Sequence, residues 1–233
     1  MSEDRGSSPP QVPQGAEAAT VVVRPYGNPL PLGFFSFGIG MALLGGLGLD
    51  LITGDQIRTA GILLAVFVFP LELLAAIMAY LTRDTGAAST LGLFATSWAS
   101  LGALYAVSPS ERTSTAVGMY LCAFALMLLP LMVVAFLGKA LLGAVLTVSV
   151  LRAVLAAAYQ LGAPEALQRA GGAAALLLVA LALYAGTAFL VEDLRQHTVL
   201  PVLRRGDARR AIEEGLPGQH TRLPREPGIR KQL

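Results

Sequence analysis

Hydrophobic residues occur along this chain in six long runs, which short polar segments separate. Each run is close to the roughly 20 residues that an α-helix needs to cross about 30 Å of hydrocarbon. The runs lack the alternation of polar and apolar residues that marks the strands of a membrane barrel. We therefore expect an all-α membrane protein, a bundle of six transmembrane helices over residues 32–52, 60–81, 87–107, 116–137, 140–158 and 171–191.

The gaps between these runs contain residues that are typical of turns, such as those at 53–55, 108–110 and 162–164. The shortest gap is Gly138-Lys139, which fits a tight hairpin turn between the fourth and fifth helices. A different division of these two runs is also compatible with the sequence. The predicted number of six helices therefore depends on this gap.

The distribution of Lys and Arg predicts how the bundle lies in the membrane, because short cytoplasmic loops carry an excess of these residues. With the N-terminus in the cytoplasm, that side holds Arg24, Arg83, Lys139, Arg195, Arg204, Arg205, Arg209 and Arg210. The other side holds Arg58, Arg112 and Arg169. We therefore expect both the N- and the C-terminus to be cytoplasmic.

The composition agrees with this layout, since 55% of the residues are hydrophobic and only 14% are charged, against about 25% in soluble domains. The first 27 residues are polar, rich in Pro, Gly and Ser, and lack the apolar core of a signal peptide. We expect residues 1–27 to be a disordered cytoplasmic tail and residues 28–202 to be a six-helix transmembrane transport domain. Residues 203–233 are expected to be a charged cytoplasmic tail, with a short helix over 207–214.

Several functional classes find no support in the sequence. The basic residues of the C-terminal segment are explained by topology, so we expect no nucleic-acid partner. The only histidines are His197 and His220, and the chain contains no HExxH, GxSxG or phosphate-binding loop motif. We expect neither an enzyme nor a metal or cofactor site. Cys122 is the only cysteine, which excludes a disulfide framework, and its apolar surroundings predict a buried thiol.

Two ionisable residues lie within the predicted helices, Glu72 in the second and Arg152 in the fifth. A charge at that depth costs at least about 2.5–3.5 kcal/mol, so each side chain needs a partner or a water-filled cavity. The two residues can form an ion pair with each other, or Glu72 can line a pore as a proton-coupling site. Arg152 can also extend its side chain to the membrane interface. Pro70 interrupts the helix of Glu72 and removes a backbone hydrogen bond.

Small residues recur every four positions in the first predicted helix, at Gly38, Ala42 and Gly46. Such a face lets another helix approach closely. We interpret it as a packing or oligomer contact rather than as a ligand site.

The segment before the first helix, residues 28–33 with the sequence NPLPLG, contains the signals of a helix start. Asn accepts hydrogen bonds from free N–H groups, and Pro is tolerated in the first turn. A helix N-terminus also attracts a carboxylate, although a helix start alone accounts for the residues.

This segment, with Phe37-Gly38 after it, resembles the Asn-Pro-Ala-Pro-Leu-Gly signature that opens the first helix of the acetate uptake, or succinate–acetate permease, family. Residues 198–202, TVLPV, resemble the closing Thr-Val-Leu-Pro of the same family, and Gly118-x-Tyr120-Leu121 also fits. The resemblance covers about residues 28–202.

The resemblance implies a six-helix protomer in the cell membrane, commonly a homo-oligomer with six copies. Each protomer would hold a channel-like or proton-coupled pathway for acetate, succinate or a similar small carboxylate. The family's hydrophobic constriction maps onto Phe37, Phe94 and Val148. The motif that would shape the cytoplasmic mouth comprises Asn28, Pro29, Pro31, Leu32 and Gly33.

The chain also departs from the family pattern. Glu72 stands where the family typically has Gln, and residues 84–87 read Asp-Thr-Gly-Ala in place of Asn-Thr-Phe-Gly. Two other functions therefore stay open. One is the transport of a different small solute on the same fold, and the other is a non-transporting membrane scaffold whose tails recruit cytoplasmic partners.

Overall fold

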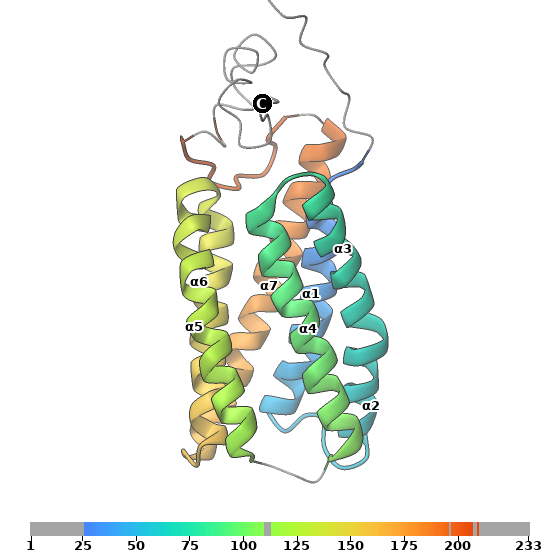
Figure 1. The fold of residues 1–233 in the computed structure, drawn as a ribbon, viewed down its shortest axis with the longest axis vertical. Helices are drawn as coiled ribbons and strands as arrows, with labels where there is room; N and C mark the ends of the chain where they lie inside the picture. Colours follow the sequence, from blue (N-terminus) through green and yellow to red (C-terminus); the bar gives the residue numbers. More distant parts are fainter. Residues whose placement is uncertain (1–25, 110–112, 196, 207–208, 210–233) are drawn as a thin grey trace, which may run out of the picture.

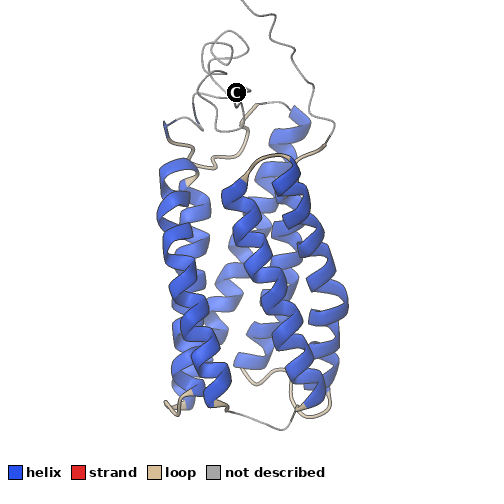
Figure 2. Cartoon of the chain, viewed as in Figure 1, coloured by secondary structure: helices blue, strands red, loops and turns tan. Residues whose placement is uncertain are grey.

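The computed structural model of the protein describes residues 26–109, 113–195, 197–206 and 209. The described part is a bundle of long helices joined by short loops (Figures 1 and 2). Its elements are α1 (Leu30–Gly48), α2 (Gln56–Leu63), the π-helical turn η1 (Leu64–Val68), α3 (Phe69–Leu81), α4 (Thr85–Val107), α5 (Thr115–Gly138), α6 (Ala140–Gln160) and α7 (Glu165–Arg195).

Because α2, η1 and α3 are continuous, these elements form six helices that are long and apolar enough to span a membrane. The predicted all-α fold with six transmembrane helices is therefore confirmed, and the protein is a multi-pass integral membrane protein. The expected hairpin at Gly138-Lys139 is also confirmed, since α5 ends at Gly138 and α6 begins at Ala140.

The helices carry apolar side chains on their outer as well as their inner faces, which suits a bundle surrounded by lipid. On α5, for example, Met119 and Val133 are exposed, whereas Leu121 and Leu128 are buried. Cys122 lies on the exposed side of α5, so the prediction of a buried thiol was wrong. Hydrophobicity alone did not separate the two faces of this helix, because lipid and core both favour apolar residues.

Helices α1 and α7 pack closely because small residues meet at their interface. A Cβ atom on Gly48 would lie 2.8 Å from the Cα atom of Gly172, and one on Gly38 would lie 3.3 Å from the Cβ atom of Ala182. Gly38 and Gly46 are buried, but Ala42 is exposed. The small residues of α1 therefore serve mainly helix packing within the chain.

A second close approach joins α2 to α4 at Gly61 and Gly102. A Cβ atom on Gly61 would lie 2.6 Å from the carbonyl oxygen of Gly102, and one on Gly102 would lie 2.7 Å from the oxygen of Gly61. Both obstacles are backbone atoms, which cannot move without separating the helices. These two glycines therefore fix the distance between the second and third membrane-spanning helices.

The second membrane-spanning helix changes its hydrogen-bonding pattern just before Pro70. At the end of η1, the N–H of Phe69 donates to the carbonyl of Leu64, five residues earlier. Pro70 has no N–H to donate, and its ring interferes with the preceding turn of a regular α-helix. The wider π-helical turn accommodates this proline and precedes the buried residue Glu72.

The start of α1 and the end of α7 lie at the same end of the bundle, which we call the inner end (Figure 1). The loops and helix ends on this side contain Arg83, Lys139, Arg195, Arg204 and Arg205, while the opposite, outer end contains Arg58 and Arg169. Arg24, Arg112, Arg210, most of the two predicted tails and most of the predicted helix at 207–214 lie outside the described residues.

Lys139 connects three parts of the inner end. Its Nζ atom lies 3.1 Å from Asp84 Oδ2 and 5.5 Å from the centre of the Phe189 ring. Burial raises the pKa of the Asp84 carboxyl, but the charge of Lys139 and the hydrogen bond from the Ala87 N–H outweigh this effect, so that the pKa lies below its usual value. Asp84 is thus held as a carboxylate that caps α4.

The segment after α7 crosses the inner end and binds the turn between α5 and α6. The N–H of Ala140 donates to the carbonyl of Leu203 at 3.1 Å, and Arg204 forms an ion pair with Glu192 of α7. Thr198 also donates to Glu192, at 2.9 Å. These contacts join the segment after α7 to the neighbouring helix ends, and they satisfy backbone groups and charged side chains that the membrane interior cannot solvate.

Candidate functional site

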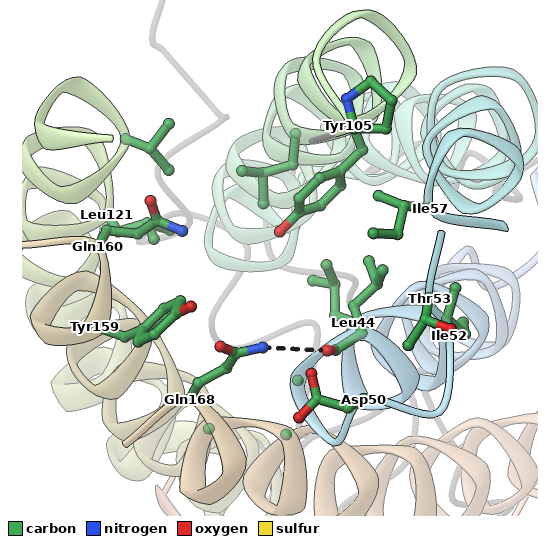
Figure 3. A pocket seen from close by; sticks show the side chains of 18 of the residues that line it. Leu44, Asp50, Ile52, Thr53, Ile57, Tyr105, Leu121, Tyr159, Gln160 and Gln168 are labelled. Atoms are coloured by element: carbon green, nitrogen blue, oxygen red, sulfur yellow. Dashed lines mark hydrogen bonds between the residues drawn. The ribbon is translucent and has the colours of Figure 1, made fainter. Parts of the chain in front are cut away.

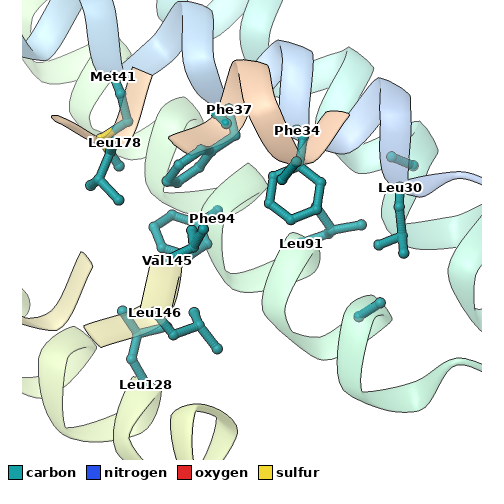
Figure 4. Packing of buried hydrophobic residues seen from close by; sticks show 14 of the residues in the cluster. Leu30, Phe34, Phe37, Met41, Leu91, Phe94, Leu128, Val145, Leu146 and Leu178 are labelled. Carbon is teal, nitrogen blue, oxygen red and sulfur yellow. The ribbon is translucent and has the colours of Figure 1, made fainter. Parts of the chain in front are cut away.

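Aromatic side chains from three helices meet in the middle of the bundle. The ring centres of Phe37 on α1 and Phe94 on α4 are 4.9 Å apart, in an edge-to-face arrangement. Trp98 lies 6.1 Å from Phe37, and Phe124 of α5 lies 5.2 Å from Phe94. We call these four residues the aromatic plug. It contains two of the three residues that the sequence predicted for the constriction, facing each other (Figure 4).

The third predicted residue, Val148, lies beside this group rather than in it. The residues of α6 that line the cavity next to Phe37 and Phe94 are Leu142, Val145 and Leu146. Val148 is partly buried and packs against the hydrophobic core. Figure 4 shows Val145 next to Phe94. Val145 is thus the α6 residue that lines the inner cavity beside Phe94, whereas Val148 does not line it.

A small cavity, the inner cavity, lies between the aromatic plug and the inner end of the bundle. Its volume is about 30 Å³, enough for about one or two water molecules and too little for a carboxylate ion. The cavity is therefore closed to solutes in this conformation. It is lined by Leu30, Gly33, Phe34, Phe37, Glu72, Ala87, Thr90, Leu91, Phe94, Leu142, Val145 and Leu146.

Glu72 is the only ionisable residue among these lining residues, and its side chain is fully buried. One carboxyl oxygen, Oε2, accepts a hydrogen bond from the indole N–H of Trp98. The other, Oε1, is buried without a hydrogen-bond partner among the described residues. Glu72 thus combines one hydrogen bond to the aromatic plug with one buried oxygen that has no partner among the described residues.

The motif at residues 28–33, which leads into the first turn of α1, lies at the inner side of this cavity. The Asn28 side chain accepts a hydrogen bond from the N–H of Leu30 at 3.0 Å, and the N–H of Gly33 donates to Pro29 at 3.1 Å. This is the helix start that the sequence predicted. Leu30 and Gly33 line the cavity, and Pro31 is buried. Leu32, also part of the predicted mouth, is only partly buried and packs against the core.

A larger cavity, the outer cavity, lies at the opposite end of the bundle and has a volume of about 370 Å³. It is surrounded by the end of α1, the start of α2, the ends of α4 and α6 and the start of α7 (Figure 3). The Gln168 side chain donates to the carbonyl of Leu47 at 3.3 Å and braces its wall. Its polar and charged lining residues are Asp50, Thr53, Tyr105, Arg152, Tyr159, Gln160 and Gln168.

Arg152 lines the outer cavity, whereas Glu72 lines the inner one. The ion pairs found among the described residues do not include a pair between them. The ion pair that the sequence offered as one option is therefore not formed in this structure. The two charges lie on opposite sides of the aromatic plug.

The plug separates the two cavities along the helix axes. Phe37 lines the inner cavity, and Leu44, two helical turns further along α1, lines the outer one. Two turns correspond to about 10 Å of helix. Met41 of α1 and Trp98 of α4 fill this interval, and both are almost fully buried. The structure therefore has the form of two cavities in one bundle with a closed hydrophobic barrier between them.

Sequence reasoning did not identify Trp98, Tyr105 or Tyr159 as site residues. Trp98 and Tyr105 follow Phe94 by four and eleven residues, which places all three on one face of α4. This spacing, together with the fact that Trp98 is the only tryptophan, was the available signal. No comparable pattern marks Tyr159, since its role depends on how α6 packs against other helices.

Comparison with known proteins shows which solved structure the fold resembles and to which family the chain belongs. A solved structure described as the "Structure of the bacterial acetate channel SatP" superimposes with a TM-score of 0.67 at 21% sequence identity. The match covers 76% of this chain and 99% of the other. This likeness confirms the arrangement of the helices. Comparison with curated protein sequences gives no significant match.

The model of one protein family matches residues 11–204, which is most of the chain. The matched range includes both motifs on which the family resemblance was based, at residues 28–33 and 198–202. The family resemblance is thus confirmed, and this chain belongs to the GPR1/FUN34/yaaH family.

Proposed function

We propose that the protein provides a pathway across the membrane for acetate or similar small monocarboxylates. The proposal is supported by membership of the family and by the likeness of the fold to a protein that is described as an acetate channel. The bundle has no groups of three or more His, Cys, Asp or Glu residues that could hold a metal among the described residues.

The observation that carries the proposal is the aromatic plug between the two cavities. Apolar rings that close a narrow passage exclude water, and a hydrated ion cannot give up its water shell there at low cost. A small carboxylic acid has an apolar methyl end and needs only a brief separation of the rings. Phe37 and Phe94 are in suitable positions to open and close such a passage, with Val145 of α6 opposite them.

We further propose that Glu72 links transport to pH. Glu72 lines the inner cavity, where a substrate would pass after the plug opens, and its Oε1 atom has no hydrogen-bond partner among the described residues. An ionised carboxyl next to a substrate carboxylate is unfavourable, because like charges repel strongly where water is excluded. Passage then requires that one of the two groups holds a proton. In this way Glu72 would couple the flux of substrate to the proton concentration.

We also propose an orientation, a location and an assembly for the protein. The excess of Lys and Arg at the inner end supports a cytoplasmic location for the two termini and thus an extracellular outer cavity. We propose the cell membrane as the location and a homo-oligomer, six copies by the family resemblance, as the assembled form. Each protomer would contain its own complete pathway, since both cavities and the plug are built from a single chain.

Uptake of labelled acetate into proteoliposomes tests the proposed function. We expect the purified protein to accelerate uptake of acetate over protein-free vesicles, and to do so less well for carboxylates with longer chains. A series from formate to benzoate defines which acids pass. Absence of flux for every short carboxylate, with a protein that is monodisperse in detergent, would overturn the proposal.

A further inference from the structure

The outer cavity contains one positive charge that no described residue of its lining balances. Among its described lining residues, Asp50 and Arg152 are the only ones with a formal charge. Asp50 is already engaged, because its Oδ2 atom lies 3.7 Å from Nε of Arg169. The ion pairs found among the described residues leave Arg152 without an acidic partner.

The surroundings of Arg152 make this unbalanced charge significant. Its Nε atom is buried and has no hydrogen-bond partner in the described part of the chain. A guanidinium group has five N–H donors in a fixed planar fork and stays protonated in proteins. Placing it within a membrane-spanning helix without an anion is unfavourable, and an anion in the cavity would offset part of that cost.

Two tyrosines face the same space from different helices. The hydroxyl groups of Tyr105 on α4 and Tyr159 on α6 point into the outer cavity (Figure 3). A phenol can donate one hydrogen bond to a carboxylate oxygen. The described lining of the cavity therefore combines one cation and two neutral donors, and the one carboxylate in it, that of Asp50, is paired with Arg169.

We propose that Arg152, with the hydroxyl groups of Tyr105 and Tyr159, forms a binding site for a small carboxylate anion in the outer cavity. The identity of the anion rests on the proposed transport function, whereas the site itself rests on the geometry. The planar guanidinium matches the two oxygens of a carboxylate, and such bonds are about twice as strong as those between neutral groups. The cavity volume of about 370 Å³ also lies within the usual range for small-molecule sites.

With this site, the two ends of the bundle would have different roles in transport. Arg152 would hold the ionised acid at the outer end, before it enters the apolar plug. Glu72, at the other side of the plug, would meet it afterwards. Capture by Arg152 therefore affects the concentration of substrate at half-maximal rate, while passage through the plug affects the maximal rate.

The test compares Arg152→Gln and Arg152→Lys with wild type. Arg58→Gln is the matched control, because Arg58 also belongs to the outer end but is exposed and does not line the outer cavity. Labelled-acetate uptake gives KM and the maximal rate for each protein. We expect Arg152→Gln to raise KM about tenfold to hundredfold, Arg152→Lys to raise it less because it keeps the charge without the fork, and Arg58→Gln to leave it unchanged.

A second measurement does not depend on transport. Sodium acetate should raise the melting temperature of the detergent-purified protein relative to sodium chloride at the same ionic strength, and Arg152→Gln should abolish the difference. A folded Arg152→Gln variant with the KM and the acetate-induced stabilisation of wild type would overturn the proposal. If Arg152→Gln does not fold, Tyr105→Phe/Tyr159→Phe decides in its place, and wild-type values of both quantities would again refute the site.

The two measurements also separate this inference from the proposed function. Acetate-induced stabilisation that requires Arg152, without flux of any carboxylate, would refute transport and support the site. Acetate flux with a KM that is independent of Arg152 and of the two tyrosines would support transport and refute the site.

Discussion

The hydrogen bond between Trp98 and Glu72 is the most specific polar contact inside the bundle, and it can be tested by a double-mutant cycle. Both side chains are buried, and the indole N–H donates to one oxygen of the carboxyl. We consider Trp98→Phe, which removes the donor, Glu72→Met, which removes the acceptor, and the combination of both. Glu72→Gln serves as a conservative variant, because its amide oxygen can still accept the bond.

The size of the effect follows from two terms. Loss of a buried hydrogen bond that leaves its partner unsatisfied costs about 1–3 kcal/mol. Trp98→Phe also creates a void, since the indole ring fits closely against Gly40, where a Cβ atom would already be 3.0 Å from the ring. Removal of a few buried atoms adds about 1–2 kcal/mol. Trp98→Phe alone should therefore destabilise the protein by about 2–5 kcal/mol, and the hydrogen-bond term should vanish in the Glu72→Met background.

Unfolding by sodium dodecyl sulfate in mixed micelles, followed by circular dichroism, measures these free energies. We expect the double variant to be more stable than the sum of the single effects predicts, by about 1–3 kcal/mol. Glu72→Gln should retain most of the wild-type stability. Single effects that add to within about 0.5 kcal/mol would refute a direct bond between the two side chains.

Three further predictions concern packing, pH and transport. Gly61→Ala should lower the free energy of unfolding by more than about 2 kcal/mol, because the new Cβ atom would lie 2.6 Å from a backbone oxygen of α4. The control Gly92→Ala, whose Cβ atom would have no other atom within 4 Å, should be neutral or stabilising. Equal melting temperatures of the two variants would contradict the close contact between α2 and α4. The lowered pKa of Asp84 stabilises the fold above the usual Asp pKa of about 3.9, and this contribution is lost as pH falls through the lower pKa of the folded state. Asp84→Asn should therefore reduce the melting temperature at pH 7 and flatten its decline below pH 4, and an unchanged acid profile would count against the ion pair. Glu72→Gln should change the pH dependence of acetate uptake, and an identical profile at normal expression would exclude Glu72 as the proton-coupling group.

The sequence was sufficient to predict the six helices and their order, because span length and hydrophobicity are properties of each helix by itself. It also located the helix start at Asn28 and the pairing of Phe37 with Phe94, the latter through the family resemblance. The boundaries differed by a few residues. The first helix ends at Gly48 rather than at residue 52, since the chain turns at Asp50, which has a positive φ of 58°.

The features that the sequence did not reveal depend on how the helices pack against one another. The sequence left open whether Arg152 and Glu72 form an ion pair, because it does not show which residues of two helices face each other. In the structure the two side chains line different cavities, on opposite sides of the plug. The choice between Val148 and Val145 depends on a rotation of α6 by less than one turn, which an apolar helix without a polar face does not encode. The bond from Trp98 to Glu72 joins residues in different helices, and no periodicity within one helix indicates such a contact.

The central claim is that the aromatic plug controls the passage of small carboxylates, and substrate selectivity tests it most directly. Uptake of labelled acetate and labelled benzoate should be compared for wild type, Phe37→Ala and Phe67→Ala, where Phe67 is an exposed phenylalanine on η1 outside the plug. We predict that Phe37→Ala raises benzoate uptake relative to acetate uptake, while Phe67→Ala keeps the wild-type ratio. A ratio that is the same in all three folded proteins would contradict the claim.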